Sequence, residues 1–328
     1  MLKIGVLGAG HLGKIHIKCI KRIDRYELVG FYDPDVATAK AVEEELGVRC
    51  FATVEALIDA VEVVDIVTPT VQHFECASKA LQRRRHVFIE KPIVATPDEA
   101  AKLMKLAEEA GVKVQVGHVE RFNPAFIAAE PFIKAPKFVE AHRLALFNPR
   151  GTDVPVVLDL MVHDLDILFT IIDSPVTRVS ACGVAIVSPT PDITNARIEF
   201  ENGSVANLTA SRISLKNMRK TRIFQNDAYI TVDFLDKKTE ITRIHDHEVT
   251  GYPYSLTLDT ADGSTRQITL ERPEIHPINA IQTELESFYD SIIHNTVPVV
   301  SIQDGVKVLN LAYDILKEAE DRRQKIEF

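Results

Sequence analysis

Three glycines near the N-terminus most constrain what this chain can fold into. Gly8, Gly10 and Gly13 follow the apolar run Leu2 to Leu7 with a G-x-G-x-x-G spacing. Such a loop between a strand and a helix brings the backbone close to a pyrophosphate, because the first glycine permits the tight turn, the second leaves room for the phosphate and the third lets helix and strand pack. The helix N-terminus then faces the anion with free N–H groups. The loop residues predicted to bind a dinucleotide are Gly8, Gly10, His11, Leu12 and Gly13.

An acidic residue stands at the matching distance. Glu27 to Phe31 is predicted to be a second strand, and Asp33 follows Gly13 by twenty residues, where a carboxylate accepts hydrogen bonds from the adenosine ribose. The same residue could also simply start a helix in Asp33-Pro34-Asp35. We expect NAD rather than NADP, because the carboxylate would repel a 2′-phosphate and no arginine follows it closely.

Length and composition limit the class of protein. A chain of 328 residues predicts about two domains of ~150 residues each. The formal net charge of -9 argues against a nucleic-acid partner, and no apolar run is long enough to span a bilayer. Met1-Leu2-Lys3 leads straight into a strand, so we expect a cytoplasmic protein. The four cysteines are far apart, and we expect no metal site.

Strands and helices alternate over the first part of the chain. Strands are expected at about 2–7, 27–32, 64–68, 86–90 and 112–117, with helices at 12–23, 34–46, 53–60, 71–83 and 97–110. This alternation predicts a doubly wound parallel sheet of the Rossmann type in a first domain, residues 1–120.

The pattern changes to period two in the second domain, residues 121–328. Strands are expected at 138–147, 178–187, 196–200, 205–213, 219–224 and 229–234, with a hairpin turn at 201–204 and helices at 155–172, 279–294 and 303–324. The last helix could pack back on the first domain. We expect a large, mainly antiparallel open sheet with helices on one face. The other face could form a homodimer or homotetramer.

Glu90-Lys91-Pro92 ends the fourth strand of the first domain. Ligands of doubly wound folds bind at the carboxyl ends of the strands, so Lys91 is a candidate to face the nicotinamide. The alternative is a lysine in water at the end of a strand.

The helix expected at 155–172 carries a second candidate group. At 100° per residue Asp159, His163, Asp166 and Thr170 fall within a ~60° arc, and a carboxylate four residues before a histidine can fix its tautomer and raise its basicity. His163 is thus a candidate general base oriented by Asp159, unless this edge of the helix faces bulk solvent.

These residues together resemble the Gfo/Idh/MocA oxidoreductases over essentially the whole chain. The glycine loop, Thr68-Pro69-Thr70 with His73, Glu90-Lys91-Pro92, Gly117-His118 and the Asp159/His163 pair occur in the family's order. The resemblance implies an NAD(P)-dependent dehydrogenase acting on a sugar or cyclitol hydroxyl, with Lys91 and His163 at the reacting carbon. It also places Thr68, Pro69, His73 and Glu90 on the cofactor side.

One departure narrows the comparison. Many family members have Asp-x-Gly-x-His, whereas Met161 occupies the glycine position here. The segments 117–124 and 159–166 are more similar to the subgroup of UDP-N-acetylglucosamine 3-dehydrogenases. Basic residues at 212–222 could also hold a diphosphate, or could flank a solvated turn. The candidate substrate residues are Arg121, Asn123, Asp166 and Arg212.

Two other functions remain open at this level. A fold of this kind could oxidise a free sugar or an inositol. It could also be a regulator that senses NAD or a ligand without catalysis, although such proteins usually lack the lysine or the histidine. The sequence does not divide the acid and base roles between Lys91 and His163.

Overall fold

The structure, a computed structural model, describes residues 1–148, 154–252, 254–261 and 263–326. Contacts between Cα atoms divide the chain into two units, Met1–Val119 with Asn279–Asn310, and Glu120–Ile278 with Leu311–Phe328. The division expected at residue 120 did not assign Asn279–Asn310 to the first domain. No helix in the described ranges combines the length and the apolar character needed to cross a membrane.

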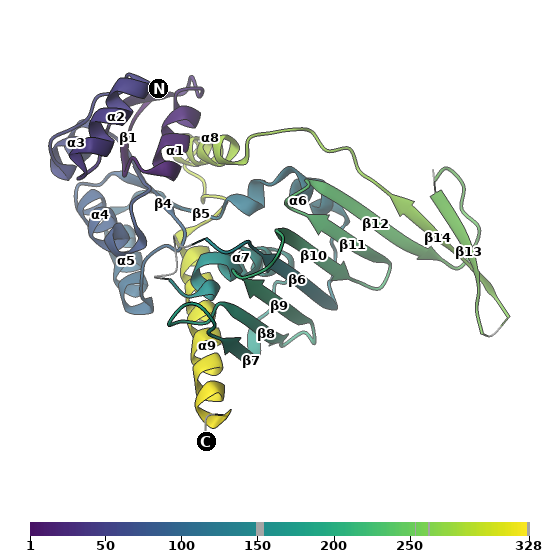
Figure 1. The fold of residues 1–328 in the computed structure, drawn as a ribbon. Coiled ribbons are helices and arrows are strands. Elements are labelled where there is room, and N and C mark those ends of the chain that lie inside the picture. Colours follow the sequence, from purple (N-terminus) through teal and green to yellow (C-terminus); the bar gives the residue numbers. More distant parts are fainter. Residues whose placement is uncertain (149–153, 253, 262, 327–328) are drawn as a thin grey trace. The chain divides into compact units, whose positions relative to one another are not determined.

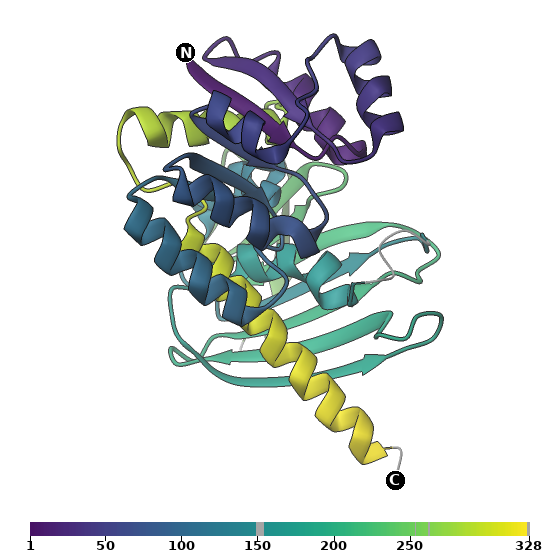
Figure 2. The ribbon, with the colours of Figure 1, turned by 90° about the vertical axis from the view of Figure 1, so that its left-hand side faces the viewer.

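The first unit is a parallel sheet with helices on both faces (Figures 1 and 2). The strand order is β2-β1-β3-β4-β5, and all neighbouring strands are parallel, which confirms the predicted doubly wound fold. The strands are β1 (Leu2–Leu7), β2 (Tyr26–Tyr32), β3 (Val63–Ile66), β4 (His86–Glu90) and β5 (Val114–Gly117). The helices are α1 (His11–Ile20), α2 (Val36–Leu46), α3 (Val54–Ala60), α4 (Thr70–Gln82), α5 (Pro97–Ala110) and α8 (Ala280–Ile293).

Helix α8 completes the core of this unit from far along the chain. Leu285 and Phe288 are fully buried in the same apolar cluster as Ile4 and Phe88, and the Tyr26 hydroxyl donates to the Leu285 carbonyl at 3.1 Å. Burial of these side chains removes apolar surface of the β1–β4 region from water. Local sequence patterns do not predict that a helix packs against residues so far away in the chain.

The second unit contains a nine-stranded sheet in the order β13-β14-β12-β11-β10-β6-β9-β8-β7. Only the β6–β9 pair is parallel among the described ladders, so the prediction of a mainly antiparallel sheet is confirmed. The strands are β6 (Phe138–Leu144), β7 (Val176–Val184), β8 (Ile193–Phe200), β9 (Val205–Ser211), β10 (Met218–Phe224), β11 (Ala228–Asp233), β12 (Lys238–His245), β13 (Tyr254–Asp259) and β14 (Thr265–Glu271). The last three strands were not expected from the sequence. The predicted hairpin turn joins β8 to β9 and has Gly203 at φ +82°.

Helices of the second unit lie against this sheet (Figure 1). Helix α6 (Pro124–Ala129) packs on β11 and β12, and α7 (Val162–Ile171) packs on β6. A continuous α-helix over 155–172 is wrong, because residues Val157–Met161 form a π-helical turn that precedes α7. The long helix α9 (Ile302–Ile326) runs from the residues of the first unit into those of the second.

Candidate active site

The glycine loop has the shape that the dinucleotide prediction requires. Gly8 has φ +93°, and a Cβ atom there would lie 2.7 Å from the Val67 carbonyl oxygen. A Cβ atom on Gly13 would lie 2.1 Å from the Gly8 carbonyl oxygen, whereas one on Gly10 would meet no atom within 4 Å. The first and third glycines are therefore required by the fold, and the second borders open space. Among the three glycines, Gly10 alone has no atom within 4 Å of its Cβ position, so it leaves room for a pyrophosphate.

The start of α1 is also suited to an anion. Gly10 is its N-cap residue and provides no side-chain cap, so the first N–H groups of the helix are not satisfied by a capping side chain. His11 and Leu12 lie in this exposed first turn. Backbone donors and the helix dipole favour a phosphate at such a position.

Asp33 is fixed at the carboxyl end of β2, next to the loop. Its Oδ2 accepts from the Ala9 N–H at 2.7 Å and its Oδ1 accepts from the Asp35 N–H at 2.9 Å. Near it, Leu7, Tyr32, Pro34, Val54 and Thr68 line a hollow of about 320 Å³, a volume in the range of small-ligand sites. The carboxylate and the hollow together fit the adenosine part of a dinucleotide.

His73 ties two loops together at the same edge of the sheet. Its Nδ1 lies 2.9 Å from the Pro92 carbonyl oxygen, and its Nε2 lies 2.9 Å from the Thr68 carbonyl oxygen. The ring is buried, and burial lowers the pKa of His73 although both carbonyls oppose this. Pro69 is exposed and Thr68 half-buried. The histidine thus positions the loops after β3 and β4, and direct contact with the cofactor stays a prediction.

Glu90, Lys91 and Pro92 form the end of β4. The Glu90 carboxylate is buried and its Oε2 accepts from the Lys91 N–H at 3.2 Å. A Cβ atom on Gly117 would lie 2.8 Å from Glu90 Oε1, so the glycine of β5 leaves the space that the carboxylate occupies. Burial acts to raise the pKa of Glu90, but His16 and the Lys91 ammonium hold it below its usual value. Lys91 itself is half-buried.

Asp159 and His163 belong to the second unit. Asp159 lies in the π-helical turn, His163 lies in the first turn of α7, and both are half-buried. A π-helical turn takes in more residues than an α-helical one, so the spacing of 100° per residue does not hold between Asp159 and His163. The predicted single polar stripe is wrong, because Asp166 is fully buried while Thr170 is exposed.

The candidate substrate residues make contacts inside the second unit. Arg121 binds Asp166 with two nitrogens, Nε to Oδ2 at 2.9 Å and Nη2 to Oδ1 at 2.6 Å. Asn123 caps α6 by accepting from the Ala125 N–H, and its Nδ2 donates to Glu120 and to the Phe234 carbonyl. These contacts favour a role in holding local structure over direct binding of substrate.

The basic segment at 212–222 is largely balanced by acids. Arg212 is buried and its Nη2 donates to the Val154 carbonyl at 2.5 Å. Lys220 Nζ lies 3.2 Å from Asp233 Oδ2, and Arg222 Nη1 lies 2.7 Å from Glu140 Oε2. The alternative of a positive face that attracts a diphosphate gains no support from these pairs.

Two buried polar clusters were not predicted. His16 and Asp65 bond inside the first unit, and Arg143 pairs with Glu120 and Asp164 inside the second. A signal existed for one of them, because Asp65 interrupts the otherwise apolar strand β3. A charged residue in a buried strand needs a partner.

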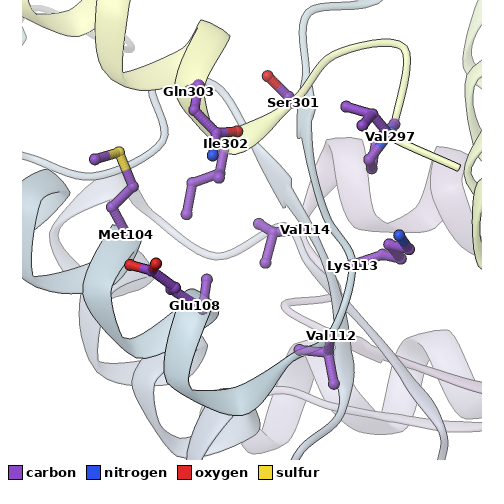
Figure 3. A pocket seen from close by; sticks show the side chains of 11 residues that line it. Met104, Glu108, Val112, Lys113, Val114, Val297, Ser301, Ile302 and Gln303 are labelled. Atoms are coloured by element: carbon purple, nitrogen blue, oxygen red, sulfur yellow. The ribbon is translucent and has the colours of Figure 1, made fainter. Parts of the chain in front are cut away.

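A further hollow of the first unit lies away from every predicted site residue. It has a volume of about 340 Å³ and lies between α5, the start of β5 and residues 297–303. Figure 3 shows Met104, Glu108, Val114 and Ile302 around it.

Comparison with known proteins agrees with this geometry. Residues 2–118 match a family model described as an oxidoreductase family with an NAD-binding Rossmann fold, and residues 145–231 match the GFO/IDH/MocA C-terminal domain. The UDP-N-acetylglucosamine 3-dehydrogenase of Acidithiobacillus ferrooxidans is 36% identical over 308 residues, covering 94% of this chain and 97% of that protein.

Further relatives extend the comparison. A solved structure of the Acidithiobacillus enzyme has a TM-score of 0.88 and 34% identity, with 98% of each chain covered. An inositol 2-dehydrogenase of Rhizobium meliloti is 26% identical, with 98% of each chain covered. The first unit therefore contains an NAD-binding Rossmann domain, and the chain belongs to the GFO/IDH/MocA family of oxidoreductases.

Proposed function

We propose that this chain is an NAD-dependent dehydrogenase that oxidises the C3 hydroxyl of UDP-N-acetylglucosamine or of a closely related UDP-sugar. The observation that carries the substrate is the 36% identity to a UDP-N-acetylglucosamine 3-dehydrogenase over 94% of the chain. The inositol dehydrogenase of comparable coverage is only 26% identical. The motif segments 117–124 and 159–166 support the same subgroup.

The cofactor residues follow from the loop geometry. We assign the pyrophosphate to the N–H groups around Gly10 and the adenosine ribose to Asp33, on the contacts described above. When bound there, NAD would supply the hydride acceptor for oxidation of the carbinol. The chain's own task is then to hold the alcohol in place and to remove its proton.

Lys91 and His163 are the acid–base groups of this proposal. A half-buried ammonium stabilises the developing alkoxide, and an imidazole accepts a proton near neutral pH. Asp159, four residues before His163, would orient the imidazole and stabilise its protonated form. Arg121, Asp166, Asn123 and Arg212 support this region through the internal contacts described above.

The enzyme is proposed to work as a homodimer or homotetramer through the open sheet. Tyr254, Leu256 and Ile244 are exposed, at 56%, 48% and 56%. Tyr254 and Leu256 alternate along β13, and Ile268 stands opposite both Leu256 and Ile244, so these side chains share one face. Strand β13 is also the edge of the sheet (Figure 1). An exposed apolar edge of this kind is a pairing surface.

We place the activity in the cytoplasm. Cys19, Cys50, Cys76 and Cys182 are all free, and reduced cysteines are typical of that compartment.

The substrate proposal is tested by NADH production. Purified enzyme is offered UDP-N-acetylglucosamine, free N-acetylglucosamine and myo-inositol, with an aminotransferase present to consume the 3-keto product. We expect NADH with the nucleotide sugar alone. Activity on free myo-inositol or a free hexose, with none on UDP-sugars, would falsify the nucleotide-sugar assignment and leave the dehydrogenase class standing.

A further inference from the structure

A buried histidine of the first unit lies between two carboxylates from different strands. His16, on α1, has Nδ1 at 2.9 Å from Asp65 Oδ2 of β3 and Nε2 at 3.2 Å from Glu90 Oε1 of β4. The side chains of His16 and Asp65 are fully buried, and that of Glu90 is 10% exposed. The first contact is a hydrogen bond, and the second is an electrostatic contact outside good hydrogen-bond alignment. The second carboxylate immediately precedes Lys91 in the chain.

The two carboxylates favour the positively charged form of the histidine. Burial alone would lower the pKa of His16, but the carboxylates of Asp65 and Glu90 raise it well above its usual value. The Phe88 ring packs against the imidazole in an edge-to-face arrangement, with the ring centroids 5.8 Å apart. The titratable groups that act on these three residues include Cys19 on α1, Tyr26 on β2, His73 on α4 and Lys91 after β4.

Two cationic groups lie close enough to stabilise the Glu90 carboxylate. Its carboxylate is influenced by the His16 imidazolium on one side and by the Lys91 ammonium on the other. The empty Cβ position of Gly117 lets the carboxylate lie against β5, where His16 holds Oε1. A buried carboxylate without a cation is strongly disfavoured, so the loss of one partner strengthens its attraction to the other.

We propose that His16, anchored by Asp65, is a positioning residue that holds the Glu90 carboxylate inside the sheet and so keeps Lys91 from being captured in an ion pair with Glu90. The inference rests on the proposed role of Lys91 as an acid–base group. It adds to that role the reason why a lysine that directly follows a buried glutamate in the chain does not form its ion pair with that glutamate.

Three variants separate this role from a merely structural one. His16→Gln removes the positive charge but keeps a hydrogen-bonding side chain, and Glu90→Gln removes the carboxylate that is to be held. The double variant joins them. His294→Gln, an exposed histidine at the end of α8, serves as the control.

The first readout needs neither cofactor nor substrate. The pKa of Lys91 is measured in cofactor-free protein by pH-dependent acetic anhydride labelling and mass spectrometry. We expect His16→Gln to raise it by about one unit, because Glu90 then pairs with the ammonium. Glu90→Gln should lower it, and adding His16→Gln to Glu90→Gln should produce no further rise, since the histidine acts through the glutamate.

The second readout is the charge of His16 itself. In the wild-type protein, nitrogen NMR should show both ring nitrogens of His16 protonated from about pH 5 to about pH 8. In the pH profile of kcat, His16→Gln should move the limb that depends on Lys91 to higher pH. It should also lower kcat near pH 7 about tenfold, with little change in KM for the nucleotide sugar.

Two results would overturn the proposal. One is a neutral His16 in the wild-type protein at pH 7. The other is a Lys91 pKa that His16→Gln leaves unchanged, or that it changes by the same amount in the wild-type protein and in the Glu90→Gln variant. The labelling result is independent of catalysis, so a failure of the role proposed for Lys91 is recognised separately, by a Lys91→Ala variant that keeps its turnover.

Discussion

A Cβ atom on Gly13 would lie 2.1 Å from the carbonyl oxygen of Gly8, five residues earlier. The helix that begins after the glycine loop can therefore pass over the end of β1 only if position 13 has no side chain. Gly10 stands between these two positions and borders open space instead. The three glycines thus divide into two that shape the loop and one that leaves room for the cofactor.

This division predicts opposite outcomes for two alanine variants. Gly13→Ala forces α1 away from β1 and should lower thermal stability together with NAD affinity. Gly10→Ala adds a methyl group where no protein atom lies, so it should keep the melting temperature while weakening NAD binding at least tenfold. Differential scanning calorimetry and titration calorimetry measure the two effects. Unchanged NAD affinity in Gly10→Ala would mean that the phosphate does not approach this residue.

The choice of cofactor is predicted by Asp33. Its carboxylate is held by the N–H groups of Ala9 and Asp35 and cannot turn away from a 2′-phosphate without losing both bonds. We expect NAD to bind more tightly than NADP. Asp33→Ser should bring the dissociation constants for NAD and NADP closer together. Equal or tighter binding of NADP to the wild-type protein contradicts the assignment.

How far the sequence predicts the fold depends on how local its signals are. Strand β1 and the start of α1 follow directly from an apolar run that ends in glycines. Helix α8 was predicted as a helix, but not that Leu285 packs in the core of the first unit, because no local pattern encodes a partner more than 200 residues away. Tyr254 and Leu256 alternate as in any half-buried strand, so β13 had a signal. The strand was not predicted because its apolar residues stand among polar ones and the whole strand is exposed.

The site shows the same limit. Gly8, Asp33 and Lys91 stand at the ends of strands, where topology places ligand-binding groups. Asp166 was assigned to the same wet face as Thr170, but both lie in the regular helix α7, where Asp166 is fully buried and Thr170 is exposed. The buried pairing of Asp166 with Arg121 depends on a three-dimensional contact that spacing along the chain does not define.

The acid–base groups are tested by single substitutions. Lys91→Ala and His163→Ala should each lower kcat by roughly two to four orders of magnitude while the dissociation constant for NAD changes little. Asp159→Asn should lower kcat by less if Asp159 only orients His163. Stopped-flow measurement of NADH formation gives the rates. A variant at Lys91 or His163 with nearly wild-type turnover would show that residue to be structural.

The buried cluster around Arg143 should dominate the stability of the second unit. Its Nη1 lies 2.8 Å from Glu120 Oε1 and its Nη2 lies 2.9 Å from Asp164 Oδ1, with the arginine 2% exposed. Arg143→Ala removes the hydrogen-bonded cation from both buried carboxylates and leaves only Arg219, at 3.8 Å from Glu120. We expect this to cost about 3 to 5 kcal/mol. Urea unfolding followed by circular dichroism measures this loss.

A matched surface pair provides the control for that measurement. Arg197 pairs with Glu199 at 3.1 Å on the surface, so Arg197→Ala should change the free energy of unfolding by less than about 1 kcal/mol. Similar losses in the two variants would show that the buried network contributes no more than an exposed pair.

The last prediction concerns acid stability and Asp192. Its Oδ2 accepts from the N–H groups of Ile186 and Val187 at 2.7 Å each and of Ser188 at 3.1 Å. Burial acts to raise the pKa of Asp192, but the Ser188 side chain and these N–H donors lower it to about 2. Since the unfolded chain has the ordinary value near 4, the ionised form is favoured by folding, and the contribution is about 2 kcal/mol wherever the carboxylate is charged in both states. That contribution is complete above about pH 4 and is lost as the pH falls towards 2. We therefore expect the difference in unfolding free energy between wild type and Asp192→Asn to be constant from pH 7 to pH 5 and to shrink at pH 3.5.

Urea titrations at the three pH values measure this difference. Asp236→Asn, which changes an exposed aspartate of the β11–β12 turn, is the control. A difference that stays constant down to pH 3.5 would place the stabilisation in packing around residue 192, since only the charged carboxylate depends on pH in this range.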